Sequence, residues 1–307
     1  MQFAVCRWLL ATTLVLGLTG CGSSAGPQVA ADPDDVEAIR NVLLSSSGGA
    51  DEAGERAEPT GFATIKGRFV FDGTPPDPIE LSITKDIEVC KPGGKPVFEP
   101  QVDVDPSTKG VANVLIFLTT KIPADDPKWV HDSYSESSEA LLSGDRAFDQ
   151  KKCRFLSPIY ALRSTQTLEI LNSDPVSHNT MISPSSPKVK PLNVTIPVGG
   201  KVTWTPGGPS KQPIPVSCSI HPWMRASVIS RDDPYFAVSA KDGSFEIKNV
   251  PAGVELEFRL WQAASKWIDG DVTLNGEAQK LKRGQIKVQL EPDQTLEWNF
   301  VLPDSLF

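Results

Sequence analysis

Residues 218–224, Cys-Ser-Ile-His-Pro-Trp-Met, place a thiol, an imidazole and a thioether at intervals of three residues. A further histidine lies upstream in the stretch Ser177-His178-Asn179. The chain has only three histidines and three methionines, and two of each lie in or beside these two stretches. This concentration of metal-ligating side chains predicts a single metal site that the surrounding chain must hold in place.

The donor types indicate which metal is expected. Cys218 and His221 can face one ion from a tight loop between two strands, and Met224 can approach it weakly from the side. The remaining ligand must come from another strand, and His178 is the only plausible histidine. Two imidazoles and a thiolate in a trigonal set, with a long axial thioether, form the blue-copper arrangement. Zinc would require four strong donors, and three histidines are too few for a copper oxidase.

Other roles for these residues stay open. Cys218 can be a plain buried thiol with His221 as an ordinary loop histidine, and Met224 can fill a gap in the core. Met181 is a rival axial donor, but its alternate-face placement makes it a core candidate first. Asn179 is expected to brace the site by hydrogen bonds.

The rest of the sequence favours β-structure. Residues 111–118 (Val-Ala-Asn-Val-Leu-Ile-Phe-Leu) give the strongest signal for a buried strand. Other strand-like segments are short and separated by turns that use many of the 27 prolines and 23 glycines, a pattern typical of β-sandwiches. No long periodic helix or tandem repeat is present. His131 has no ligand-like partner spacing and is expected to be a surface or structural histidine.

Length and charge bound the remaining possibilities. The 307 residues suffice for about two domains. The net charge is −8, and residues 32–58 alone contribute −6. No basic patch is present, so we expect no nucleic-acid partner. Residues 22–60 are rich in Ser, Gly, Ala and acids, which indicates a solvated, flexible tether.

The N-terminus predicts export. Arg7 precedes an apolar run at residues 8–18, which is too short to span a bilayer and is typical of a signal peptide. The run ends in Leu18-Thr19-Gly20-Cys21, which resembles the lipobox of bacterial lipoproteins, whose cysteine is acylated. An ordinary secretory leader is the alternative. Gly22 and Ser23 favour outer-membrane anchoring, so we expect a lipid-anchored location in the cell envelope, periplasmic or associated with the outer membrane.

The cysteine count supports a free thiol at residue 218. Cys6 leaves with the leader, and Cys21 would carry the lipid. Three cysteines remain, and in an oxidising compartment an even number would normally pair. If Cys218 is a metal ligand, Cys90 and Cys153 are left to form a disulfide. Two buried free thiols are the alternative for that pair.

The ligand loop resembles a known family. Residues 218–224 look like the C-x-x-H-P-x-M loop of amicyanin-type cupredoxins. Leu171-Asn172-Ser173-Asp174, followed by His178-Asn179, is similar to the cupredoxin strand end that carries the first histidine ligand. A longer resemblance, over roughly residues 63–262, is to exported bacterial cupredoxin-like proteins often labelled methylamine-utilisation proteins.

The longer resemblance rests on several flanking motifs: Asp149-Gln150, Phe155-Leu156-Ser157-Pro158, Pro234-Tyr235-Phe236-Ala237, Asp242-Gly243-Ser244-Phe245, Pro251-Ala252-Gly253 and Trp261. The F-x-P motif has an extra residue in this chain. Gln262 follows Trp261 where histidine is usual in the family, which removes an additional imidazole, so no second copper is predicted.

The resemblances imply an all-β protein with a cupredoxin-type Greek-key β-sandwich. The segment from Asp242 to Gly253 also resembles a carboxypeptidase-regulatory-like module, a second small β-sandwich. The expected domains are a lipoprotein signal peptide (1–20), an acidic tether (21–60), the cupredoxin-like domain (61–231) and the regulatory-like sandwich (232–307). In the alternative, residues 61–120 belong to the second sandwich, which is then discontinuous with the cupredoxin inserted into it.

The family resemblance implies electron transfer by one type 1 copper rather than an enzymatic activity. In cupredoxins the ring edge of the second histidine points toward the surface. A redox protein partner is therefore expected to dock near His221, Pro222 and Trp223. The alternatives are non-catalytic copper binding for storage, delivery or sensing, and an envelope surface protein that uses the fold only as a scaffold.

Overall fold

β-Strands provide most of the regular structure in residues 57–307, the part of the chain that the computed structural model describes. Within this range there are four five-stranded sheets and one two-stranded ladder. The only α-helix described there, α2 (Ile87–Cys90), has four residues. Short 3-10 turns lie at η1 (Pro92–Gly94), η2 (Asp132–Tyr134), η3 (Gly144–Arg146) and η4 (Asp304–Leu306). The expected all-β sandwich class is confirmed.

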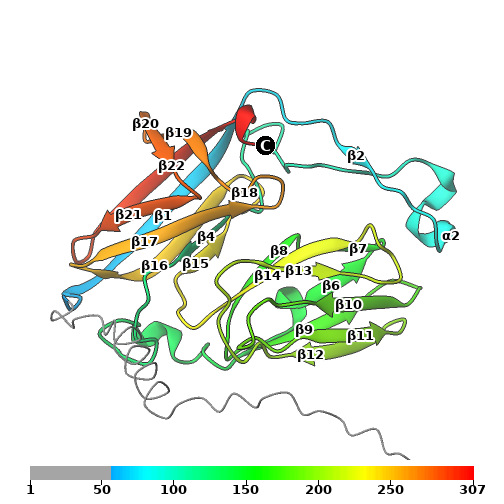
Figure 1. Cartoon of the computed structure of the whole chain (residues 1–307), viewed down its shortest axis with the longest axis horizontal. Helices are drawn as coiled ribbons and strands as arrows, with labels where there is room; N and C mark the ends of the chain where they lie inside the picture. The colour runs from blue at the N-terminus through cyan, green and yellow to red at the C-terminus, as the bar shows by residue number, and fades with distance from the viewer. Residues whose placement is uncertain (1–56) are drawn as a thin grey trace, which may run out of the picture. The chain divides into compact units, whose positions relative to one another are not determined.

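Ten strands build what we call the terminal sandwich: β1 (Gly61–Asp72), β4 (Leu115–Leu118), β15 (Phe236–Val238), β16 (Ser244–Ala252), β17 (Glu255–Gln262), β18 (Lys266–Trp267), β19 (Gly270–Leu274), β20 (Glu277–Leu281), β21 (Gln285–Gln289) and β22 (Thr295–Pro303). One sheet has the order β16-β1-β22-β19-β20. The other has the order β15-β4-β17-β18, with β21 paired to β17. Figure 1 shows these strands as one group.

Strand β1 shows why this sandwich forms. Ile65, Phe69 and Phe71 lie on one face of the strand and are buried, as the two-residue repeat of a β-strand requires. The Phe69 ring stacks on Phe245 and on Phe300, with centroid distances of 4.9 and 5.1 Å. These three rings come from β1, β16 and β22, so the core joins the first strand of the described range to the last.

The other ten strands build the inserted sandwich: β5 (Leu141–Leu142), β6 (Phe148–Lys151), β7 (Arg154–Phe155), β8 (Ile159–Arg163), β9 (Thr167–Asn172), β10 (His178–Ile182), β11 (Leu192–Ile196), β12 (Lys201–Trp204), β13 (Ile214–Ser217) and β14 (Arg225–Arg231). One sheet has the order β11-β10-β13-β14-β8, and the other the order β12-β9-β6-β7, with β5 beside β9. A separate hydrophobic cluster fills the space between them.

The strand pairing differs from the expected domain boundary at residue 61. Strands β1 and β4 pair with strands of the terminal sandwich, and the inserted sandwich occupies residues 141–231. The long parallel ladder between residues 64–72 of β1 and 295–303 of β22 fixes this arrangement. The alternative of a discontinuous second sandwich, interrupted by the cupredoxin-like one, describes this pairing.

The apolar run at residues 111–118 is a strand only in its second half. Asn113 adopts a φ of +62°, a left-handed conformation that interrupts an extended chain, and β4 begins at Leu115. Residues 115–118 are then buried on both faces. Ile116 points into the core of the terminal sandwich, whereas Phe117 packs in a small cluster that includes residues of the inserted sandwich. A strand covered on both faces needs no polar alternation.

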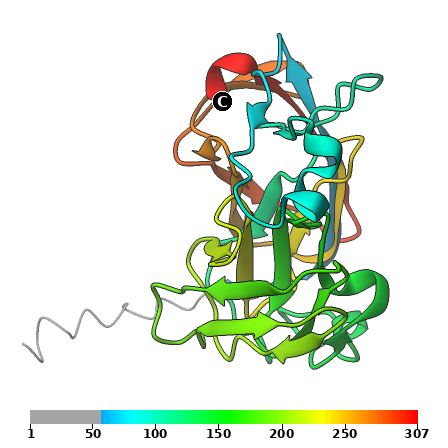
Figure 2. The ribbon, with the colours of Figure 1, turned by 90° about the vertical axis from the view of Figure 1, so that its right-hand side faces the viewer.

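A segment at residues 73–101, which we call the arm, links the two sandwiches in addition to the chain connections before β5 and after β14. It leaves β1, contains the short ladder of β2 (Ile79–Glu80) and β3 (Phe98–Glu99) together with α2, and is coloured cyan in Figure 1 and Figure 2. Ile83 and Cys90 of the arm belong to the core of the inserted sandwich. Cys90 and Cys153 form the expected disulfide.

The expected leader (1–20), the acylated Cys21 and the tether (21–60), except for its last four residues, lie outside the described residues. Among residues 57–307 no helix is long and apolar enough to span a membrane.

The Phe69 contacts predict a large effect of truncation. Phe69→Ala removes a fully buried ring and should lower the free energy of unfolding by about 3–5 kcal/mol. Phe98→Ala is the matched control, because the Phe98 side chain is 52% exposed and its loss should cost less than about 0.5 kcal/mol. Chemical denaturation of both variants measures the difference. Equal losses would contradict the assignment of Phe69 to the core.

Candidate metal centre

The loop at residues 218–224 joins two paired strands of the inserted sandwich. Ser217 at the end of β13 faces Arg225 at the start of β14. The backbone N–H of Cys218 donates to the carbonyl of Met224 at 3.3 Å, and the N–H of Met224 donates to the carbonyl of His221 at 2.9 Å. These hydrogen bonds close the loop into a compact turn, which directs Cys218 and His221 toward the same side.

Sheet topology brings His178 to this loop. Strand β10 runs antiparallel to β13, with Met181 opposite Ser217. His178 opens β10 and therefore lies level with the residues that follow β13. The side chains of His178, Cys218 and His221 are all 2% exposed or less.

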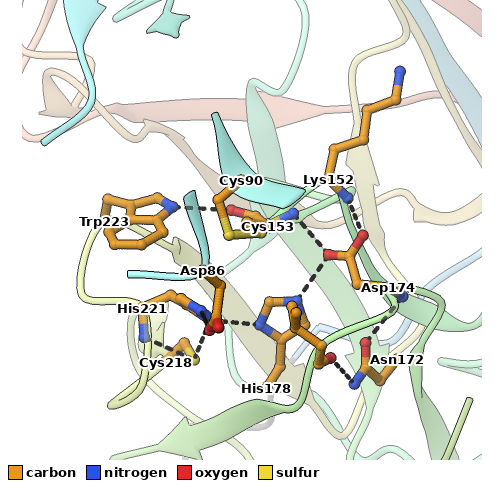
Figure 3. The surroundings of a disulfide bond; sticks show 11 residues. Asp86, Cys90, Lys152, Cys153, Asn172, Asp174, His178, Cys218, His221 and Trp223 are labelled. Atoms are coloured by element: carbon orange, nitrogen blue, oxygen red, sulfur yellow. Dashed lines mark hydrogen bonds and ion pairs between the residues drawn. A yellow bond between two sulfur atoms is a disulfide. The ribbon is translucent and has the colours of Figure 1, made fainter. Parts of the chain in front are cut away.

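The three side chains converge on one point, as Figure 3 shows. Their ligand atoms all lie within 4.8 Å of one another. The Nδ1 atoms of His178 and His221 are 2.8 Å apart, and the Sγ of Cys218 is 3.9 Å from Nδ1 of His221. The structure thus brings together three of the four predicted ligands.

Each imidazole is bound on its other nitrogen by a carboxylate. The Nε2 of His178 lies 2.8 Å from Oδ2 of Asp174, and the Nε2 of His221 lies 2.7 Å from Oδ2 of Asp86. An ionised carboxylate only accepts hydrogen bonds, so Nε2 of each ring carries the proton. The two Nδ1 atoms then face each other at 2.8 Å, where a shared proton or a cation can lie between their lone pairs. The donor set therefore fits a bound metal ion.

Two backbone N–H groups are directed at the sulfur of Cys218. It accepts hydrogen bonds from the backbone N–H groups of Asn179, at 3.2 Å, and His221, at 3.4 Å. Such donors stabilise negative charge on the acceptor. Cys218 is also the free cysteine of the described residues.

The Asn179 side chain links the two ligand-bearing segments. Its Oδ1 accepts from the backbone N–H of Ser219, at 3.2 Å. Its Nδ2 donates to the side chain of Asn193 and to the carbonyl of Val194, both at 3.0 Å. The contacts tie the ligand loop to β10 and β11, as expected of a residue that braces the site.

Burial has the largest influence on the pKa of His178 and lowers it, while the hydrogen bond to Asp174 opposes this effect. The neutral imidazole that results is the form that binds a metal.

The methionines differ in their surroundings. Met224 is 1% exposed and belongs to the hydrophobic core of the inserted sandwich. Met181 is half-buried and lies on the face of β10 opposite His178, because the side chains of a strand alternate. The axial role of Met224 stays a prediction.

A second group of potential ligands lies next to the first. Cys153, Asp174 and His178 also lie close enough to hold an ion. Cys153 is bonded to Cys90, and its backbone N–H donates to Asp174. With its sulfur in a disulfide and the Asp174 carboxylate already accepting hydrogen bonds, this group does not form a second centre. The remaining histidine, His131, accepts a hydrogen bond from the N–H of Ser133 and caps η2.

The two carboxylates were absent from the sequence-based set of site residues. Asp174 precedes His178 by only four residues, and this short spacing could have indicated it as a partner of that histidine. Asp86 lies 135 residues from His221 and on the arm, so no local pattern identifies it.

Comparison with known proteins gives a limited picture. No protein-family model matches the chain, and no curated protein matches it. Among solved structures, a reduced tryptophan-to-tyrosine variant of amicyanin is similar at 18% identity, covers 29% of this chain and 86% of its own, and has a TM-score of 0.26. Amicyanin from Paracoccus versutus is 18% identical over 38% of this chain and 97% of its own, with a TM-score of 0.24.

The Asn179 contacts predict a measurable loss of stability. Asn179→Ala leaves the N–H of Ser219 and the carbonyl of Val194 without this partner and should lower the free energy of unfolding by about 1–3 kcal/mol. Asn193→Ala removes only the contact between the two side chains and should cost less. Urea denaturation compares the two variants. An equal loss in both would show that the bonds to Ser219 and Val194 contribute nothing.

Proposed function

We propose that this protein is a lipid-anchored type 1 copper protein that carries single electrons between redox partners on the cell-envelope side. His178, Cys218 and His221 would hold one copper ion in a trigonal set, with Met224 as the axial ligand. The observation that carries this proposal is the pair of inward-facing Nδ1 atoms 2.8 Å apart beside a hydrogen-bonded sulfur. When bound, copper supplies reversible one-electron exchange.

The donor set supports copper over zinc. Structural zinc sites use four strong donors, and within the described residues this cluster offers two imidazoles and one thiolate. Asp86 and Asp174 contact the outer Nε2 atoms and accept hydrogen bonds there. Two histidines, a cysteine and a weak axial thioether are the ligands of blue-copper electron-transfer sites.

The protein's own residues favour electron transfer by keeping the ligands fixed. His178 is held by β10 and Asp174, and His221 by the closed loop and Asp86. The ligand side chains are buried, so water is excluded. A ligand set that is already in place moves little between oxidation states.

The proposed location and partner follow from the sequence. Acylation of Cys21 would keep the protein at a membrane surface of the envelope, periplasmic or at the outer membrane. The partner would be a redox protein that docks near His221, Pro222 and Trp223. His221 is itself buried, so the partner would touch the exposed Pro222 and the half-buried Trp223, whose ring centroid is 5.0 Å from that of His221.

Copper binding by the thiolate predicts a colour. The purified protein titrated with Cu(II) should develop an intense visible charge-transfer band that saturates at one copper per chain. Cys218→Ser should lose that band, because the sulfur-to-copper transition needs the thiolate. Absence of the band in the folded wild-type protein would refute the type 1 site. Reversible one-electron voltammetry then separates electron transfer from storage, since a storage site gives no reversible couple.

The two mature methionines provide a matched test of the axial ligand. Met224→Leu should raise the reduction potential, because loss of a weak axial donor destabilises Cu(II) more than Cu(I). Met181→Leu should leave the potential and the spectrum unchanged, since Met181 lies on the opposite face of β10 from His178. Voltammetry and visible spectra of both variants measure these effects. A shift in Met181→Leu alone would transfer the axial role to Met181.

A further inference from the structure

The arm brings an acidic side chain to the metal centre. Asp86 lies on the arm, and its Oδ2 accepts from Nε2 of His221 at 2.7 Å (Figure 3). The His221 side chain is fully buried, whereas the Asp86 side chain is 33% exposed. Asp86 therefore stands between the ring edge of His221 and solvent.

Asp86 contacts His221 instead of capping its own helix. Asp86 occupies the N-cap position of α2, where an aspartate normally accepts a hydrogen bond from its own helix. Here it makes no capping hydrogen bond and adopts a left-handed backbone conformation, with φ of 49°. The carboxylate is used for His221 in place of the helix.

A disulfide fixes this part of the arm to the centre. Cys90, at the end of α2, is bonded to Cys153. The N–H of Cys153 donates to Asp174 at 2.7 Å, and the carbonyl of Cys153 accepts from Nε1 of Trp223 at 3.2 Å. The disulfide thus joins the segment of Asp86 to the carboxylate that holds the other histidine, and to the ligand loop.

The turn that carries Cys153 depends on the same carboxylate. Lys152 and Cys153 connect β6 and β7 and have φ values of 55° and 53°, which are unfavourable for side chains of L-residues. Asp174 accepts the N–H groups of both residues, at 2.6 and 2.7 Å. The site and the anchoring point of the arm are therefore one hydrogen-bonded unit.

We propose that Asp86 is a positioning residue of the metal centre, supplied by the arm from far along the chain. It holds His221 with Nδ1 directed inward and closes the ring edge that would otherwise meet solvent. This inference rests on the proposed copper site. A carboxylate bound to the outer nitrogen of a metal-ligating histidine fixes the tautomer and raises the basicity of the ligand, and loss of such a partner costs about 10–100-fold in metal affinity.

Two substitutions separate the charge of the Asp86 carboxylate from its hydrogen bond to His221. Asp86→Asn keeps an acceptor oxygen for Nε2 of His221 but removes the charge, and Asp86→Ala removes both. Glu88→Gln is the matched control, because it removes the same charge from an exposed residue of the same helix. We expect Asp86→Ala to lose about 10–100-fold in Cu(II) affinity, Asp86→Asn to lose less, and Glu88→Gln to match the wild type.

The reduction potential gives a second measurement. Negative charge on the ligand stabilises Cu(II) more than Cu(I), so both Asp86 variants should have raised potentials. Each tenfold loss of Cu(II) affinity relative to Cu(I) corresponds to about 59 mV. Chelator competition and voltammetry on the full chain measure these quantities. Affinities and potentials of both Asp86 variants equal to those of Glu88→Gln would overturn the inference while leaving the copper site intact.

A measurement on the metal-free protein tests the contact between Asp86 and His221 without copper. In the metal-free, ¹⁵N-labelled full chain, the Nε2–H proton of His221 should be protected from solvent exchange and observable by NMR. The protection should persist in Glu88→Gln and be lost in Asp86→Ala. If no variant binds copper, the proposed function fails, but retained protection in Asp86→Ala is the result that would overturn the positioning role.

Discussion

Two buried imidazole nitrogens face each other at 2.8 Å, and much of the surrounding structure serves to keep them there. Each ring is held from behind by a carboxylate, so neither can turn its protonated nitrogen inward. The sulfur of Cys218 adds a third electron-rich atom, held by two backbone N–H groups. Such an arrangement is electrostatically unfavourable without a cation or a shared proton between the two Nδ1 atoms.

Several contacts within residues 57–307 couple the two sandwiches. Strand β4 belongs to the terminal sandwich but directs Phe117 toward the inserted one. Arg231 at the end of β14 donates to the carbonyl of Leu118. The arm adds a covalent link through Cys90 and Cys153. The candidate metal centre therefore combines Asp86 of the arm with residues of the inserted sandwich.

The sequence predicts candidate ligands that lie close together in the chain, but it does not predict contacts between residues that lie far apart in it. The residues of the ligand loop are only three apart, and the scarcity of histidine left His178 as the remaining choice. The arm carboxylate was not predictable, because only the folded arm brings Asp86 to His221. The predicted domain boundary at residue 61 differs from the strand pairing for a similar reason, because β1 pairs in parallel with β22, which lies far along the chain. The strand predicted at residues 111–118 is longer than the observed β4, because the left-handed backbone conformation of Asn113 interrupts it.

The parallel pairing of β1 with β22 also constrains the order in which the chain folds during synthesis. Residues 295–303 are synthesised after all strands of the inserted sandwich. Strand β1 therefore lacks its partner β22 while every strand of the inserted sandwich is already present. During that interval one edge of β1 lacks its ladder, and Phe69 lacks its contact with Phe300. An unpaired, apolar strand edge is a place where nascent chains associate with one another. The long chain separation of β1 and β22 therefore makes the terminal sandwich the half more exposed to association during synthesis, although the candidate metal centre lies in the other half.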